Sequence, residues 1–208
     1  MFHRYFYIFL LLIKSGLLLA DKGQVNLLIY GDSISAGYGM DKDKQWSEEL
    51  QKILTEEKIN LEIINKSLSG ETTGGGLSRL ERVLDNSKPS YILIELGGND
   101  ALRGYPPAKI KNNIEQMINL SIKRGVKVFL MQIRILPNYG KRYQSSFESI
   151  YQDVAEENSI PLIPFMLNDI ALNQDLMLDD GIHPNVSAQP LIAQFIYNNL
   201  LPLMSEVD

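Results

Sequence analysis

The chain has 208 residues, of which 45% are hydrophobic and 22% are charged, so it can build one domain with an ordinary core. Its formal net charge is −5 and it has no block of basic residues, which argues against a nucleic-acid partner because phosphate binding needs a concentrated positive surface. The absence of cysteine excludes disulfides, thiolate nucleophiles and cysteine-based zinc sites.

The first twenty residues, MFHRYFYIFLLLIKSGLLLA, differ in composition from the rest of the chain. Arg4 precedes an apolar run that Lys14 interrupts, and Ala20 offers a small residue for cleavage. This pattern predicts a secretory signal peptide at 1–20, followed by a single domain at 21–208. An uncleaved anchor is the alternative, although the uninterrupted apolar run is shorter than the roughly 20 residues that span a bilayer.

The rest of the chain alternates between apolar runs and amphipathic segments. In chain order, the patterns predict strand 25–30, helix 46–57, strand 61–65, helix 77–84, strand 91–96, helix 110–123, strand 126–133, helix 147–158, strand 161–165 and helix 190–201. This alternation predicts a parallel sheet covered by helices on both faces. In such sheets, ligands bind beyond the carboxyl ends of the strands.

Polar and flexible residues follow three of the predicted strands. Ser33 lies in GDSISAGYG, Gly70 lies in SLSGETTGGG, and Asn99 lies in LGGND. A serine hydroxyl, a backbone N–H free of a side chain and an uncharged amide suit an attack on a carbonyl group. Taken singly, each has a simpler interpretation: Asp32 and Ser33 could cap the next segment, Gly70 could belong to a flexible loop, and Asn99 could cap a turn.

A late segment, DDGIHPN, holds one of only two histidines in the chain. His183 follows Asp180 by three residues, so that one turn of chain can bring the carboxylate to the imidazole ring. Histidine is the side chain whose ordinary pKa suits the activation of a serine. A structural Asp–His pair is the alternative, and a single histidine without cysteine makes a poor set of metal ligands.

The four segments together resemble the four blocks of the SGNH (GDSL-like) hydrolase superfamily. Further stretches, ELGGNDALRGYPP, LMQIR, PNYGKRY and DDGIHPNVSAQP, resemble its group of bacterial periplasmic acyl-CoA thioesterase I / protease I / lysophospholipase L1 enzymes. The likeness extends over essentially all of 21–208. It implies a three-layer α/β/α, flavodoxin-like sandwich with a five-stranded parallel sheet.

The resemblance also implies roles for residues. Ser33 would be the nucleophile, His183 the general base and then the general acid, and Asp180 the carboxylate that orients the imidazole. Asp179 is the competing carboxylate, but the spacing of the family places the orienting residue three positions before the histidine.

The oxyanion hole would consist of the backbone N–H of Ser33, the backbone N–H of Gly70 and the side-chain amide of Asn99. The resemblance implies neither a metal ion nor an organic cofactor. It implies a small-molecule or lipid substrate, namely a fatty acyl ester or thioester, for a periplasmic enzyme that could make transient contact with membrane lipids. Nothing in the sequence indicates more than a monomer.

Two segments resemble parts of the family's acyl-binding region. TTGGGLSRL, at 72–80, is similar to a mobile loop that covers acyl chains, which makes Thr72 and Leu77 candidate substrate-binding residues. IRILPNYG, at 133–140, is similar to a loop that lines the acyl site, and its sequence differs somewhat from the Arg-Leu-Pro motif that is usual in the family. Within it, Ile135 and Pro137 are the candidates.

Two other functions stay open on the sequence alone. A carbohydrate O-acetylesterase or acyltransferase could use the same scaffold with a pocket for short acyl groups. A binding domain without catalytic activity is the second of these alternatives, and labelling of Ser33 by a fluorophosphonate would distinguish it from an enzyme.

Overall fold

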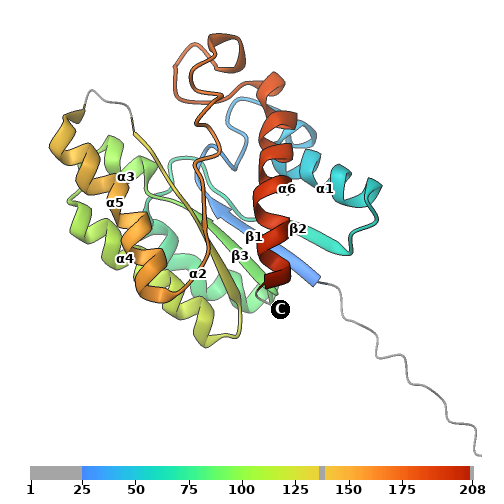
Figure 1. Ribbon diagram of the computed structural model, residues 1–208, viewed down its shortest axis with the longest axis horizontal. Helices are drawn as coiled ribbons and strands as arrows, with labels where there is room; N and C mark the ends of the chain where they lie inside the picture. Colours follow the sequence, from blue (N-terminus) through green and yellow to red (C-terminus); the bar gives the residue numbers. More distant parts are fainter. Residues whose placement is uncertain (1–24, 136–138, 207–208) are drawn as a thin grey trace, which may run out of the picture.

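A computed structural model describes residues 25–135 and 139–206, and the predicted signal peptide lies outside these residues (Figure 1). A five-stranded, all-parallel sheet has the order β2-β1-β3-β4-β5. Its strands are β1 (Val25–Gly31), β2 (Leu61–Asn65), β3 (Tyr91–Glu95), β4 (Lys127–Met131) and β5 (Leu162–Ile163). The predicted parallel sheet is confirmed.

Helices cover both faces of the sheet. They are α1 (Trp46–Glu56), α2 (Thr73–Ser87), α3 (Gly98–Leu102), α4 (Pro107–Lys123), α5 (Lys141–Asn158) and α6 (Gln189–Glu206). Helices α1 and α6 pack together over one face, while α2, α4 and α5 form a row over the other (Figure 1). The short 3-10 helices η1 (Lys42–Lys44) and η3 (Gln174–Leu176) lie in loops, and η4 (Val186–Ala188) leads directly into α6. The predicted three-layer sandwich is therefore confirmed.

The core forms because the central strands are apolar along their whole length. Every residue of β3 is buried, and Leu27 to Tyr30 of β1 have no exposed surface. On α1, Trp46, Leu50 and Leu54 recur at four-residue spacing and are fully buried on one face. A strand that is buried on both faces needs apolar residues at consecutive positions, which these strands have.

The structure corrects the expectation of a mobile loop at 72–80. Apart from Thr72, this segment is the first half of α2, which begins four residues before the predicted helix. Thr72 is the N-cap and accepts the N–H of Gly75, and buried Asp100 accepts both the backbone N–H and the hydroxyl of Thr73. Helix formation here follows from this capping, which compensates for the low helix propensity of glycine.

Other element boundaries also differ from the sequence pattern. Helix α5 begins six residues early, strands β4 and β5 are shorter than predicted, and α3 was not predicted. The first six residues of α5 are mostly polar, and only Tyr143 and Gln144 among them are partly buried, so their helical periodicity is weak. No helix in the described part of the chain has the length and apolar character needed to cross a membrane.

Candidate active site

The carboxyl ends of β1 and β3 form the point at which the strand order changes direction. From β1 the chain moves to β2 on one side and then returns to β3 on the other side. The two central strands are paired so that Gly31 lies opposite Glu95. Loops that leave such a switch point diverge, and the crevice between them is where α/β proteins bind ligands.

A cavity of about 490 Å³ opens at this edge. Such a volume lies within the range of about 300–1,000 Å³ that is usual for small-molecule sites. Its wall includes Ser33, Gly70, Asn99 and His183, which follow β1, β2, β3 and β5 respectively. The structure therefore brings together the residues that the four sequence blocks singled out.

Ser33, His183 and Asp180 form one hydrogen-bonded row. The Oγ of Ser33 lies 2.8 Å from Nε2 of His183, and Nδ1 of His183 lies 2.7 Å from Oδ2 of Asp180. The other carboxylate oxygen of Asp180 accepts the backbone N–H groups of Ile182 and His183, each at 2.9 Å. Asp180, and not Asp179, is thus the carboxylate bonded to the ring.

The hydrogen bonds to Asp180 fix its ionisation state. Partial desolvation raises the pKa of this carboxyl group, but the backbone and ring N–H groups of His183 and the N–H of Ile182 outweigh it, so the pKa falls to about 2. An ionised carboxylate can only accept hydrogen bonds, so it requires the proton of the ring to be on Nδ1. Nε2 is then left as the acceptor that faces Ser33.

The loop that carries His183 is held by backbone contacts on both sides. Met177 pairs with Pro184 in an antiparallel bridge, and the N–H of Leu178 donates to the carbonyl of His183 at 2.8 Å. Gly181 has a φ of +66°, a conformation that suits glycine, and it allows the tight turn between Asp180 and His183. The imidazole is consequently placed by a short closed loop.

Tyr38 is a neighbour of the imidazole that the sequence did not single out. Its ring stacks on His183 with centroids 4.3 Å apart and 29° between the planes, and about half of its side chain is exposed. Gly37 and Gly39, on either side, have φ values of +66° and +77°. The sequence did contain a signal for this residue, because an aromatic side chain between two glycines in the loop after a strand is held out from the turn.

Three residues that line the cavity have N–H groups without an acceptor among the described residues. The backbone N–H groups of Ser33 and Gly70 donate to no acceptor within 25–135 and 139–206, and the amide of Asn99 uses one of its two N–H groups. Gly70 has a φ of +78° in a turn that the N–H of Glu71 closes on the carbonyl of Leu68 at 3.1 Å. A residue with a side chain would be strained there.

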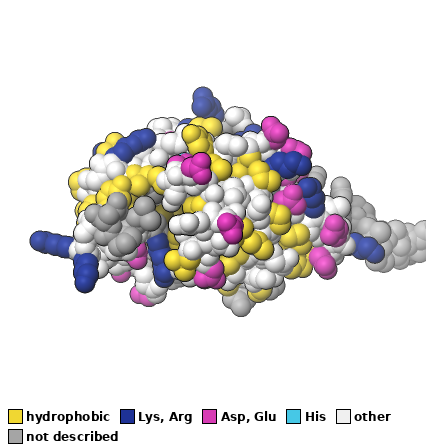
Figure 2. Space-filling model, turned by 90° about the horizontal axis from the view of Figure 1, so that it is seen from above, with side chains coloured by type: hydrophobic (Ala, Val, Ile, Leu, Met, Phe, Trp, Pro, Cys, Tyr) yellow, Lys and Arg dark blue, Asp and Glu magenta, His cyan; other side chains and the backbone are white. Residues whose placement is uncertain are grey.

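The remainder of the cavity wall is mostly apolar. It includes Ile133, Ile135, Phe165, Leu167, Leu172 and Met177. Hydrophobic side chains are also exposed on this face of the molecule (Figure 2), and the exposed ones that line the cavity are Tyr38, Leu102, Leu172 and Ile182. The cavity can therefore accommodate an apolar chain next to the hydroxyl of Ser33.

The four predicted substrate-binding residues have different locations. Ile135 lines the cavity. Thr72 caps α2 and Leu77 packs against the core from that helix, so neither belongs to the cavity wall. Pro137 lies outside the described residues.

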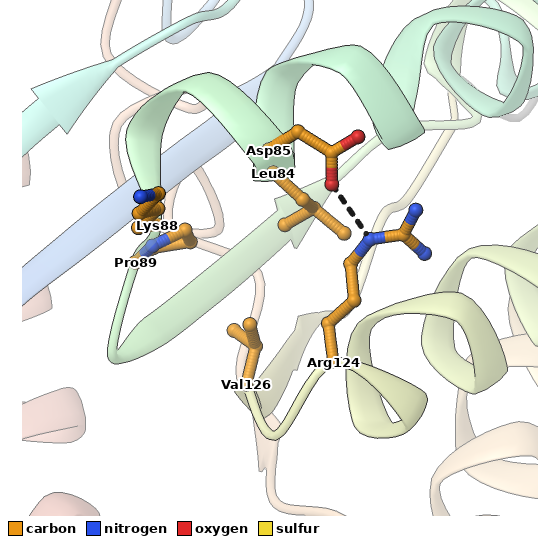
Figure 3. A pocket seen from close by; sticks show the side chains of 6 residues that line it. All are labelled: Leu84, Asp85, Lys88, Pro89, Arg124 and Val126. Atoms are coloured by element: carbon orange, nitrogen blue, oxygen red, sulfur yellow. Dashed lines mark hydrogen bonds and ion pairs between the residues drawn. The ribbon is translucent and has the colours of Figure 1, made fainter.

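A second depression lies at the opposite edge of the sheet, where β3 and β4 begin (Figure 3). It has a volume of about 390 Å³, and Arg124 there donates to Asp85 at 3.0 Å. It contains no nucleophile–base pair. Within the described residues, no group of three or more His, Cys, Asp or Glu side chains is arranged to hold a metal ion.

Comparison with known proteins agrees with this geometry. The model of the GDSL-like lipase/acylhydrolase family matches residues 29–189, which include all four blocks. The chain belongs to this family. It is a hydrolase of ester bonds, and the resemblance stated from the sequence is confirmed.

Individual relatives are similar over most of their length. An arylesterase of Vibrio mimicus is 46% identical over 88% of this chain and 91% of its own. Thioesterase 1/protease 1/lysophospholipase L1 of Escherichia coli K12 is 39% identical over 96% of this chain and 92% of its own. The crystal structure of the esterase EstA from Pseudoalteromonas, inhibited by monoethylphosphonate, has a TM-score of 0.85 and 39% identity and covers 86% of this hydrolase and 98% of EstA.

Proposed function

We propose that the protein cleaves carboxylic esters and thioesters of fatty acyl groups through an acyl-enzyme on Ser33. The observation that carries this proposal is the continuous row Asp180–His183–Ser33 at the wall of a largely apolar cavity. Similar proteins are named arylesterase and thioesterase 1/protease 1/lysophospholipase L1, which supports acyl substrates of this class.

In the first step, the Oγ of Ser33 attacks the acyl carbonyl and its proton passes to Nε2 of His183, 2.8 Å away. The imidazolium that forms is stabilised by Asp180 at 2.7 Å. The developing oxyanion accepts hydrogen bonds from the backbone N–H groups of Ser33 and Gly70 and from the amide of Asn99. Loss of one such donor costs roughly 10²–10³ in turnover.

In the second step, the tetrahedral intermediate collapses. The bond between the acyl carbon and the leaving oxygen or sulfur breaks, and His183 gives its proton to the departing alcohol or thiol. Water then attacks the acyl-enzyme with His183 again as the base, which releases the carboxylic acid and restores Ser33. The acyl substrate and one water molecule supply every atom that these steps transfer, and the proton is carried by His183.

The apolar wall supports a preference for medium or long acyl chains over acetyl groups. Each CH₂ group that the cavity buries contributes about 0.8 kcal/mol, or roughly fourfold in kcat/KM. The names of the similar proteins do not favour the carbohydrate O-acetylesterase or acyltransferase alternative. Exposed Leu102, Leu172 and Ile182 at the cavity support transient contact with lipid substrates.

A panel of p-nitrophenyl esters tests this function, with the Ser33→Ala protein as the control. We expect kcat/KM to increase from acetate to octanoate and activity to disappear in the Ser33→Ala protein. A fluorophosphonate should label the wild-type protein but not this variant. A preference for acetate would instead favour the acetylesterase alternative, and activity without Ser33 would contradict the proposed nucleophile.

We also propose that 1–20 is removed as a signal peptide and that the domain at 21–208 works in the periplasm as a monomer. The charged start, the apolar run and Ala20 support this export. N-terminal sequencing of the protein recovered from a periplasmic fraction should begin at Asp21. A mature protein that keeps Arg4 would contradict cleavage.

A further inference from the structure

Asp32 is a buried carboxylate that is adjacent to Ser33 in the sequence and hydrogen-bonded to Asn99. It directly follows β1 and precedes Ser33, and only 4% of its surface is exposed. Its Oδ1 accepts the N–H of Ile34 at 3.0 Å, and its Oδ2 accepts an N–H of the Asn99 side-chain amide at 3.1 Å. A lone acidic residue is rarely buried, so this position needs an explanation.

The packing around Asp32 is close. Gly98, next to Asn99, has no side chain, and a Cβ atom there would lie 3.3 Å from Oδ2 of Asp32. The backbone that begins α3 therefore lies directly on the carboxylate. The pairing of β1 with β3 therefore fixes the position of the Asp32 carboxylate relative to the Asn99 amide.

An amide can present either its oxygen or its nitrogen to a neighbour, and an oxyanion hole needs the nitrogen. An ionised carboxylate accepts hydrogen bonds and donates none, so it permits only the Nδ2 end of Asn99 to face it. Nδ2 carries two N–H groups. One is donated to Asp32, and within the described residues no acceptor takes the other.

We propose that Asp32 is a positioning residue for the oxyanion hole: its carboxylate fixes the orientation of the Asn99 amide, so that the second N–H is left for the oxyanion. This inference rests on the proposed function of Ser33. Asp32 acts through Asn99 and does not itself contact the reacting carbonyl.

The neighbouring carboxyl group of Glu95 is expected to be protonated, which leaves Asp32 as the charged member of the pair. Burial raises the pKa of Asp32 to about 6, although its hydrogen bonds to Ile34 and Asn99 oppose this, so it is mainly ionised at pH 8. Burial, and then the charge of Asp32, raise the pKa of Glu95 well above its ordinary value. Glu95, which accepts the hydroxyl of Ser35 at 2.7 Å, therefore carries the proton of the pair.

A double-mutant cycle of Asp32→Asn and Asn99→Ala tests this inference. The new asparagine side chain can keep its oxygen on the N–H of Ile34, which turns its NH₂ group toward Asn99. The Asn99 amide must then turn its own oxygen toward the introduced NH₂ group, and a donor of the oxyanion hole is lost. We expect kcat to fall about 10²–10³-fold in each single variant, the effect of removing one donor, with KM changed by less than about threefold.

The double variant decides the question. If Asp32 acts through Asn99, the Asp32→Asn change costs nothing further in the Asn99→Ala background. Equal losses in both backgrounds, or a kcat of Asp32→Asn within twofold of wild type, would overturn the inference. Asp43→Asn, an exposed carboxyl-to-amide change away from the cavity, is the matched control and should retain wild-type kcat.

Asp32→Ala is measured in the same cycle, so that the test does not depend on the folding of one variant. It removes the acceptor without adding a donor, so we expect a smaller loss of kcat than for Asp32→Asn, and again none in the Asn99→Ala background. Fluorophosphonate labelling of Ser33 keeps the two proposals separate. If the wild type is labelled but the losses of kcat in the cycle are additive, only the role of Asp32 is contradicted. If the wild type is not labelled, the proposed function itself is contradicted.

Discussion

Replacement of Asp180 by asparagine tests the row of hydrogen bonds most directly. In the wild type, Oδ1 of Asp180 accepts the N–H groups of Ile182 and His183, and Oδ2 accepts the N–H on Nδ1 of the ring. Asparagine at this position keeps the two backbone bonds only if its oxygen takes the place of Oδ1. Its NH₂ group then faces the ring, so Nδ1 must become an acceptor and the proton must move to Nε2.

A ring protonated on Nε2 cannot accept the proton of Ser33. We therefore expect kcat for p-nitrophenyl butyrate at pH 8 to fall by about 10⁴, the effect of imposing the wrong tautomer in a serine triad, which corresponds to about 5.4 kcal/mol. KM should change little, because Asp180 does not line the cavity. Steady-state kinetics and phosphonate labelling rates both report this loss.

The neighbouring carboxylate supplies the control. Asp179 is exposed, and Asp179→Asn should have wild-type kcat. A kcat of Asp180→Asn within tenfold of the wild type would refute the assignment of the tautomer. A large loss in Asp179→Asn together with a small one in Asp180→Asn would make Asp179 the orienting residue.

Three further changes have definite expected outcomes. Tyr38→Ala removes the ring that stacks on His183 and should lower kcat about 2- to 30-fold, from a cation–π contribution of about 0.5–2 kcal/mol, whereas Tyr38→Phe should stay near wild type in the same ester assay. In Gly97→Ala, the new Cβ would collide with the hydroxyl of Tyr151 at a φ of +123°, so urea unfolding should show a loss of about 3 kcal/mol; an unchanged midpoint would contradict this. Because burial raises the pKa of Glu95, the folded state holds a proton that the unfolded state releases, and stability present at low pH is lost as pH rises through the folded pKa. As pH rises above the ordinary pKa of a glutamate, the thermal midpoint of Glu95→Gln should therefore depend less on pH than that of wild type, and parallel curves would count against this reasoning.

The sheet and the location of the site could be predicted because they depend on local patterns. Buried parallel strands need consecutive apolar residues, and the runs that became β1, β2 and β3 were found to within one residue at either end. Ser33, Gly70 and Asn99 lie within five residues of the ends of these strands, so the topology brings them to one edge of the sheet. His183 was found because histidine is so rare in this chain.

The remaining features depend on contacts between distant segments. Glycines favour loops on their own, so the helical start of α2 could not be inferred without Asp100, which caps it from another element. The stacking of Tyr38 on His183 joins residues that are far apart in the sequence and that no periodic pattern relates. The contact of Asp32 with Asn99 could not be predicted, because it exists only once β1 and β3 have paired.

The hydrogen bond between Ser33 and His183 joins positions 150 residues apart. Nearly the entire polypeptide must therefore leave the ribosome before the hydroxyl gains its proton acceptor. On the mechanism proposed for Ser33, a chain that is still being synthesised is inert toward acyl esters. The nucleophile and its base meet only when the segment that follows β5 has joined the carboxyl end of β1.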